Sequence, residues 1–139
     1  MRTDVRGRLR FRLTFSDVDA VQFFFADYYR WMERALAELM AACGYSRAQS
    51  MRERRGFPVL ESGCRYEKRA VVDDQLEVVA TFVDMRERSF RVGYTFYHLD
   101  GSVVARGFTQ HVTVDLDIMK ACAVPAAFRD GDMVEAEDA

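Results

Sequence analysis

Apolar and polar positions alternate in several stretches of the chain, which predicts strands with one buried face. The first alternation covers residues 7–15, where Leu9, Phe11 and Leu13 fall between arginines and a threonine. A polar stretch at residues 16–19 ends it. Later alternation predicts strands at 59–70, 75–84, 89–99 and 103–115. The dipeptide Asp100-Gly101 is typical of a hairpin turn, so the last two strands are expected to pair.

A different spacing, of three and four residues, predicts one long helix after the first strand. The apolar positions that follow it are Tyr28, Trp31, Met32, Ala35, Leu36, Leu39, Met40 and Cys43. Gly44 is well placed to end this helix. The charged segment 46–56 is compatible with either a short exposed helix or a mobile loop.

The order of these elements predicts an α+β fold. A single amphipathic helix needs a partner layer, and an antiparallel sheet wrapped around it is the simplest one. The 139 residues suffice to bury roughly two-thirds of the surface of the unfolded chain, so one domain is expected. We predict a single domain over 1–139, with its core in about 7–116 and a flexible acidic tail at about 130–139.

Composition excludes several classes of function. A net charge of −2 argues against a general nucleic-acid binder. No apolar run approaches the ~20 residues that cross a bilayer, and the first residues lack the apolar core of a secretion signal. The three cysteines are widely spaced, so neither a disulfide framework nor a zinc site is predicted. We therefore expect a cytoplasmic protein without a metal or membrane partner.

Two carboxylates directly before the helix are the first candidates for chemistry. Asp17 and Asp19 precede three consecutive phenylalanines, and apolar surroundings are expected to raise the pKa of a carboxyl group. The nearby start of the helix offers backbone N–H groups to a developing oxyanion. This combination suits acyl transfer or thioester hydrolysis. The simpler interpretation is that one of these side chains only caps a turn.

The same region resembles a known family. Residues Phe15-Ser16-Asp17-Val18-Asp19-Ala20, followed by Asp27-Tyr28-Tyr29-Arg30-Trp31-Met32-Glu33, are similar to the hotdog-fold acyl-CoA thioesterases of the 4-hydroxybenzoyl-CoA thioesterase type. In that family a D-x-D-x-x-G segment precedes an Asn-Tyr pair that opens the central helix. The hairpin around Asp100-Gly101 also agrees, and the resemblance covers about residues 8–116. It implies a hotdog fold, a curved antiparallel sheet around one long helix.

The resemblance also implies a set of site residues. Asp19 matches the catalytic carboxylate, as nucleophile on the thioester carbonyl or as general base for water. Tyr28 matches an aromatic residue that borders the acyl pocket. The family's glycine after the second aspartate is replaced here by Val21-Gln22-Phe23, so Gln22 is a candidate side-chain donor in its place. Further candidates for the acyl pocket are Phe24, Phe25 and Trp31, for which core packing is the alternative.

Coenzyme A carries several phosphates, which arginine and lysine bind well. Our candidates for CoA binding are Lys68, Arg86, Arg88 and Ser89. The alternative is an ordinary solvated charged surface. The two histidines, His98 and His111, lie far from Asp19 in the sequence and suggest neither a metal site nor the histidine of a hotdog dehydratase.

The leading hypothesis is hydrolysis of an acyl-CoA or acyl-carrier-protein thioester through Asp19. No cofactor is expected beyond the coenzyme A of the substrate. The resemblance implies a homodimer as the minimum and allows a homotetramer, with active sites at the subunit boundary. Because the usual glycine is missing, an acyl-binding or CoA-ester-binding protein without hydrolysis is the alternative. A structural dimerisation module is a third possibility.

Overall fold

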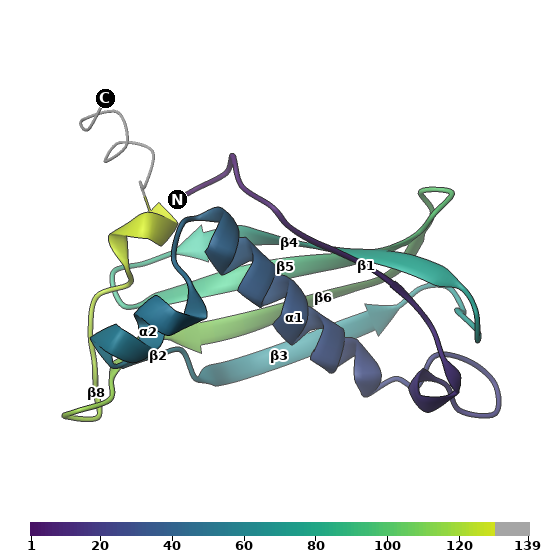
Figure 1. The fold of residues 1–139 in the computed structure, drawn as a ribbon, viewed down its shortest axis with the longest axis horizontal. Coiled ribbons are helices and arrows are strands. Elements are labelled where there is room, and N and C mark those ends of the chain that lie inside the picture. The colour runs from purple at the N-terminus through teal and green to yellow at the C-terminus, as the bar shows by residue number, and fades with distance from the viewer. Residues whose placement is uncertain (130–139) are drawn as a thin grey trace.

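The main sheet contains five antiparallel strands in the order β1-β4-β5-β6-β3. The computed structural model describes residues 1–129 (Figure 1), and the tail predicted at 130–139 lies outside them. The strands are β1 (Gly7–Arg12), β3 (Val59–Tyr66), β4 (Gln75–Met85), β5 (Ser89–His98) and β6 (Val103–Val112). The predicted strand regions and the hairpin between β5 and β6 are confirmed. The strand expected at 7–15 ends earlier, at Arg12, and that expected at 59–70 ends at Tyr66. The strand expected at 103–115 ends at Val112, and Val114–Asp115 belong to a second, smaller sheet.

The predicted long helix is α1 (Asp27–Ala42), and it crosses the concave face of the sheet (Figure 1). Its core face consists of Tyr28, Met32, Ala35 and Leu39, all buried. The helix packs mainly on β1 and β4. Gly7 permits this close approach, because a Cβ there would overlap the backbone of α1. The expected sheet wrapped around one helix is therefore confirmed.

The charged segment after α1 forms a short helix rather than a loop. This helix, α2 (Arg47–Glu53), begins at Ser46, whose Oγ accepts a hydrogen bond of 3.1 Å from the Gln49 N–H. A small second sheet joins β2 (Arg55–Gly56), β7 (Val114–Asp115) and β8 (Lys120–Ala121). A single 3-10 turn, η1 (Phe15–Asp17), follows β1. None of the helices in residues 1–129 combines the length and apolar character needed to cross a bilayer.

The segment near the end of the described chain contributes to the core, which the sequence pattern did not predict. Residues 126–129 form a helical turn, and Phe128 is fully buried. Its ring packs on those of Tyr45, Phe82 and Phe90, at centroid distances of 5.3 to 5.5 Å. The helical turn that carries Phe128 lies near the C-terminal end of α1 (Figure 1, yellow).

Candidate active site

Asp17 has a structural role in the connection between β1 and α1. Its carboxylate is buried and accepts hydrogen bonds from the N–H and the hydroxyl of Thr14, both at 2.9 Å. Because both donors lie three residues earlier, the side chain closes the turn that follows β1. Asp17 therefore fits the simpler interpretation of a turn-capping carboxylate, and the Asp19 carboxylate also caps a turn, through backbone N–H groups two and three residues ahead.

Asp19, in the same connection, is exposed and differently bonded. Its Oδ1 accepts hydrogen bonds from the N–H groups of Val21, at 2.7 Å, and Gln22, at 2.9 Å. These two donors hold the pKa of the Asp19 carboxyl below its ordinary value. The expected rise of this pKa beside the phenylalanines is wrong, because the side chain stays in solvent. Within residues 1–129 no hydrogen bond engages Oδ2, so one oxygen is fixed and the other is available.

Two unpartnered backbone donors directly precede α1. The N–H groups of Phe25 and Ala26 make no hydrogen bond within residues 1–129, whereas the N–H of Phe23 bonds Ala70 and that of Phe24 bonds Asp17. They stand directly before the first turn of α1, where the helix dipole places partial positive charge. A carboxylate and unpartnered amides therefore occupy one short connection, residues 13–26, which we call the Asp19 connection.

Three of the predicted substrate-binding residues belong to this connection. Phe24 and Phe25 are 39% and 57% exposed, so they form an apolar surface next to Asp19. The Phe25 carbonyl accepts a hydrogen bond from the Tyr66 hydroxyl at 3.1 Å, which ties the connection to the end of β3. Gln22 is half-buried, and its carbonyl accepts from the Asp19 N–H at 2.9 Å. Their contact with a substrate stays a prediction.

Tyr28 is buried in the core, and Trp31 is half-buried on the β1 side of α1. The Tyr28 ring stacks on Phe23 at 4.2 Å, and burial raises the pKa of its phenol. The Trp31 ring stacks on Phe11 at 3.8 Å, nearly parallel to it. Core packing, the alternative weighed for these aromatic residues, describes the surroundings of both rings.

A cavity of about 750 Å³ lies on the other side of α1. Because the helix covers β1 and β4, it leaves part of the concave face over β5, β6 and β3 open, and α2 and the segment before β3 enclose this space. Apolar walls come from Leu36, Met40 and Phe57, among others. None of the predicted site residues lines the cavity, including Asp19.

Sequence reasoning missed the polar groups of this cavity. His111, Thr109 and Tyr94 line it and are buried. The His111 Nδ1 lies 2.9 Å from the Phe57 carbonyl, and its Nε2 lies 2.7 Å from the Thr109 hydroxyl. The Thr109 hydroxyl in turn lies 2.8 Å from the Tyr94 hydroxyl. The alternation of Thr109, His111 and Thr113 on one face was the available signal, but polar alternation is normally the mark of a solvent face.

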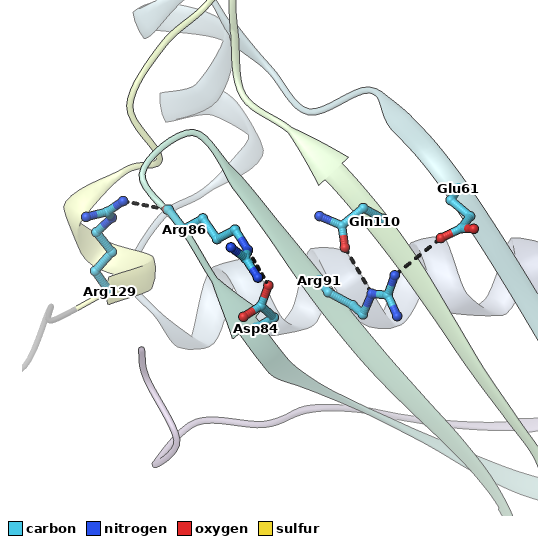
Figure 2. Close-up of polar contacts among 6 residues, drawn as sticks. All are labelled: Glu61, Asp84, Arg86, Arg91, Gln110 and Arg129. Atoms are coloured by element: carbon cyan, nitrogen blue, oxygen red, sulfur yellow. Dashed lines mark hydrogen bonds and ion pairs between the residues drawn. The ribbon is translucent and has the colours of Figure 1, made fainter.

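The predicted CoA-binding residues fall into two groups. Arg86, Arg88 and Ser89 connect β4 to β5, and Arg86 forms an ion pair of 3.0 Å with Asp84 (Figure 2). Figure 2 also shows Arg91 held between Gln110 and Glu61. The Arg88 guanidinium makes no ion pair or hydrogen bond within residues 1–129.

Lys68 is at the opposite end of the sheet from this group. Its Nζ donates a hydrogen bond of 3.1 Å to Ser102, and the Ala70 carbonyl close by bonds Phe23 of the Asp19 connection. Arg12 of β1 pairs with Gln75 at the start of β4, whereas Arg86 follows the end of β4. Within a single chain, Lys68 therefore lies near Asp19, whereas Arg86, Arg88 and Ser89 lie at the opposite end of the main sheet.

Comparison with solved structures identifies the fold. The gentisyl-coenzyme A thioesterase BH1999 has a TM-score of 0.79 and 24% identity, with 88% of this chain and 98% of that chain covered. Slr0204, a 1,4-dihydroxy-2-naphthoyl-CoA thioesterase from Synechocystis, has a TM-score of 0.80 and 16% identity over 91% and 94% of the two chains. A mutant of 4-hydroxybenzoyl CoA thioesterase in complex with 4-hydroxybenzoyl CoA has a TM-score of 0.81 and 21% identity over 91% and 97%.

These likenesses confirm the hotdog fold that the sequence predicted. A search of curated proteins gives no match. A family model, however, matches residues 13–131, a range that begins at the Asp19 connection and includes the whole sheet from β3 onward. The chain therefore belongs to the thioesterase-like superfamily.

Proposed function

We propose that this protein hydrolyses an acyl-CoA thioester, or the equivalent acyl-carrier-protein thioester, with Asp19 as nucleophile or general base. The observation that carries the proposal is the bonding of Asp19. One carboxylate oxygen is fixed by the amides of Val21 and Gln22, and the other is available. With a lowered pKa, the carboxyl group is ionised throughout the neutral range, as attack on a carbonyl or abstraction of a water proton requires.

The unpartnered amides of Phe25 and Ala26 support hydrolysis over simple binding. The loss of the family's glycine motivated the alternative of a non-hydrolytic binding protein. In the structure, however, these two N–H groups remain available beside the start of α1. Donors that meet a thioester oxygen stabilise the negative charge that develops on it during attack. The Gln22 side chain is then not needed for this purpose.

The position of the cavity supports an active site that is shared between two copies. The outer edge of β3 has no partner strand within residues 1–129, and Val59 and Leu60 on it are exposed. An unpaired edge is a template for pairing with another chain. The Asp19 connection lies at the Tyr66 end of β3, and the cavity lies at its Val59 end. Antiparallel pairing of two copies through β3 would bring the Asp19 connection of one copy beside the cavity of the other.

In such a pair, the turn of one copy that contains Arg86, Arg88 and Ser89 would also lie at the same end of the joined sheet as the partner's Asp19 connection. This would unite the two separated groups of CoA-binding candidates around one thioester, with the free Arg88 guanidinium as the best-placed phosphate ligand. The named neighbours act on CoA esters of hydroxylated aromatic acids. The apolar cavity walls are compatible with an acyl group of this kind.

The test compares Asp19→Asn with Asp100→Asn. Asp100 is a close match as a control, because it too is exposed, accepts a backbone N–H bond from two residues ahead and has a lowered pKa. With a panel of benzoyl, hydroxybenzoyl, phenylacetyl and medium-chain CoA esters, we expect thiol release to fall about 10²–10⁴-fold in Asp19→Asn only. Full turnover in Asp19→Asn would refute the assignment. Tight binding without turnover in the wild type would establish the non-hydrolytic alternative.

A further inference from the structure

The hydrogen-bond chain in the cavity wall has a direction that the geometry determines. The Phe57 carbonyl can only accept, so Nδ1 of His111 must carry the proton of that 2.9 Å bond. Burial lowers the pKa of His111, which makes the imidazole neutral at pH 7. The Nε2 of a neutral imidazole protonated at Nδ1 is an acceptor. The Thr109 hydroxyl must therefore donate to it across 2.7 Å.

The same logic extends to Tyr94. Because the single proton of the Thr109 hydroxyl is used on His111, Thr109 can only accept from Tyr94, and the Tyr94 hydroxyl must donate across 2.8 Å. Burial also raises the pKa of this phenol, so the proton stays on Tyr94. Every proton of the chain is thus used within the chain, and a lone pair of the oxygen of Tyr94, which lines the cavity, is left over.

We infer that Tyr94 determines specificity in this cavity: its phenol oxygen accepts a hydrogen bond from a hydroxyl or amino group on the acyl portion of the substrate. Thr109 and His111 are positioning residues that fix the direction of the Tyr94 proton. This inference rests on the proposed function and adds the polarity of the acyl group to it. Some substrates have only a hydrogen-bond acceptor at this position, such as an ether oxygen. Two lone pairs, one on that atom and one on the Tyr94 oxygen, would then face each other without a proton between them.

The surroundings of the chain keep its direction fixed. The His111 ring stacks on Phe90 at 4.9 Å and is 2% exposed, so water does not compete for its nitrogens. The Glu33 carboxylate, on the α1 side of the cavity, acts on Tyr94 and contributes to its raised pKa.

The experiment measures binding in the Asp19→Asn variant, so that it does not depend on turnover. The probes are the three isomers of hydroxybenzoyl-CoA, each compared with its methoxybenzoyl-CoA counterpart by calorimetric titration. At least one hydroxyl isomer is expected to bind about 5–10-fold more tightly than its methoxy counterpart, the effect of one net hydrogen bond. Addition of Tyr94→Phe should reduce this ratio to about one.

Thr109→Val is the sharper test. It removes the hydroxyl that accepts the Tyr94 proton, so this proton can then point into the cavity. In this variant the methoxy ester should bind as well as or better than the hydroxy ester, and Thr109→Ser should restore the original preference. Tyr45→Phe is the matched control. It removes a buried hydroxyl whose bond, to Glu53, lies outside the cavity, and it should leave the ratio unchanged.

Other outcomes separate this inference from the proposed function. If hydrolysis depends on Asp19 but no isomer shows a preference that Tyr94→Phe removes, the inference fails and the thioesterase stands. If no CoA ester binds, the acyl-CoA form of the proposed function fails, and titration with p-cresol against 4-methylanisole tests the cavity alone by the same variants. The ¹⁵N shifts of His111 should show the neutral Nδ1–H form at pH 7; the Nε2–H form would reverse the chain and overturn the inference.

Discussion

The Asp19 connection and the cavity place their polar groups in opposite environments. The carboxylate of Asp19 is in solvent, and it is held by amides two and three residues away in the sequence. The hydroxyls and the imidazole of the cavity wall are buried and come from β5 and β6, and the segment before β3 contributes the Phe57 carbonyl that His111 contacts. The first arrangement is a local turn that a short motif can encode. The second arrangement needs the β5–β6 hairpin and the segment before β3 to pack together before its groups meet.

The strongest way to test this comparison is to ask whether the two regions serve one site across two copies. Ala37→Phe fills the cavity from α1, whereas Asp19→Asn removes the carboxylate. Each variant alone should be nearly inactive, while a heterodimer of the two, purified through two different tags, regains about half of the wild-type activity, because one of its two shared sites is intact.

The control for this mixing experiment is Ala41→Phe, an exposed position on α1 outside the cavity lining, which should remain active by itself. An inactive heterodimer, with both parent chains folded and paired, would place the carboxylate and the acyl pocket of one site within a single chain. Size-exclusion chromatography with light scattering establishes that the pairs are present.

Loss of an aromatic side chain should lower the stability of the protein more at the cavity end than in the Asp19 connection. Phe128 is fully buried among other rings, so Phe128→Ala is expected to lower the free energy of unfolding by about 3–5 kcal/mol. Phe15, which lies in the Asp19 connection and is 86% exposed, is the matched control, and Phe15→Ala should change the free energy of unfolding by less than about 0.5 kcal/mol. Urea unfolding of the isolated variants provides both values. Equal effects would mean that Phe128 does not anchor the aromatic cluster.

The sequence predicted the elements better than the site, for a physical reason. Alternation and helical spacing report which face of an element is apolar, so the strands, α1 and their order could be derived from residues such as Leu76, Val78 and Met32. The same rule fails at Thr109 and His111, because polar residues that face inward look like a solvent face until their partners are known. The burial of Phe128 could not be predicted for a similar reason, because the rings that it packs on come from the segments on either side of α2 and from two strands.

The pKa of Asp19 illustrates a further limit of sequence reasoning. Three neighbouring phenylalanines suggested a desolvated carboxylate, but the direction in which a side chain points is not encoded by the composition around it. The turn directs Asp19 to solvent and supplies two backbone donors, and these lower the pKa instead of raising it.

The smallest expected effect is a pH dependence of stability that arises at the cavity end. Burial lowers the pKa of His111 in the folded chain, whereas an unfolded histidine titrates near its ordinary value of 6.5. Between the lowered value and 6.5, the unfolded chain binds more protons, so the free energy of unfolding should decrease as the pH falls below 6.5 and level off below the folded pKa. The loss is about 1.4 kcal/mol for each unit by which the two pKa values differ.

Replacement of His111 by Gln should remove this decrease, because no imidazole is then left to protonate in the unfolded chain at that position. The chain has 2 histidines, so His98→Gln is the natural control and should keep the wild-type pH dependence. Urea unfolding at several pH values between 5 and 8 measures the slopes. A wild-type protein that becomes more stable on acidification would contradict the neutral, buried His111 on which the direction of the Tyr94 hydrogen bond depends.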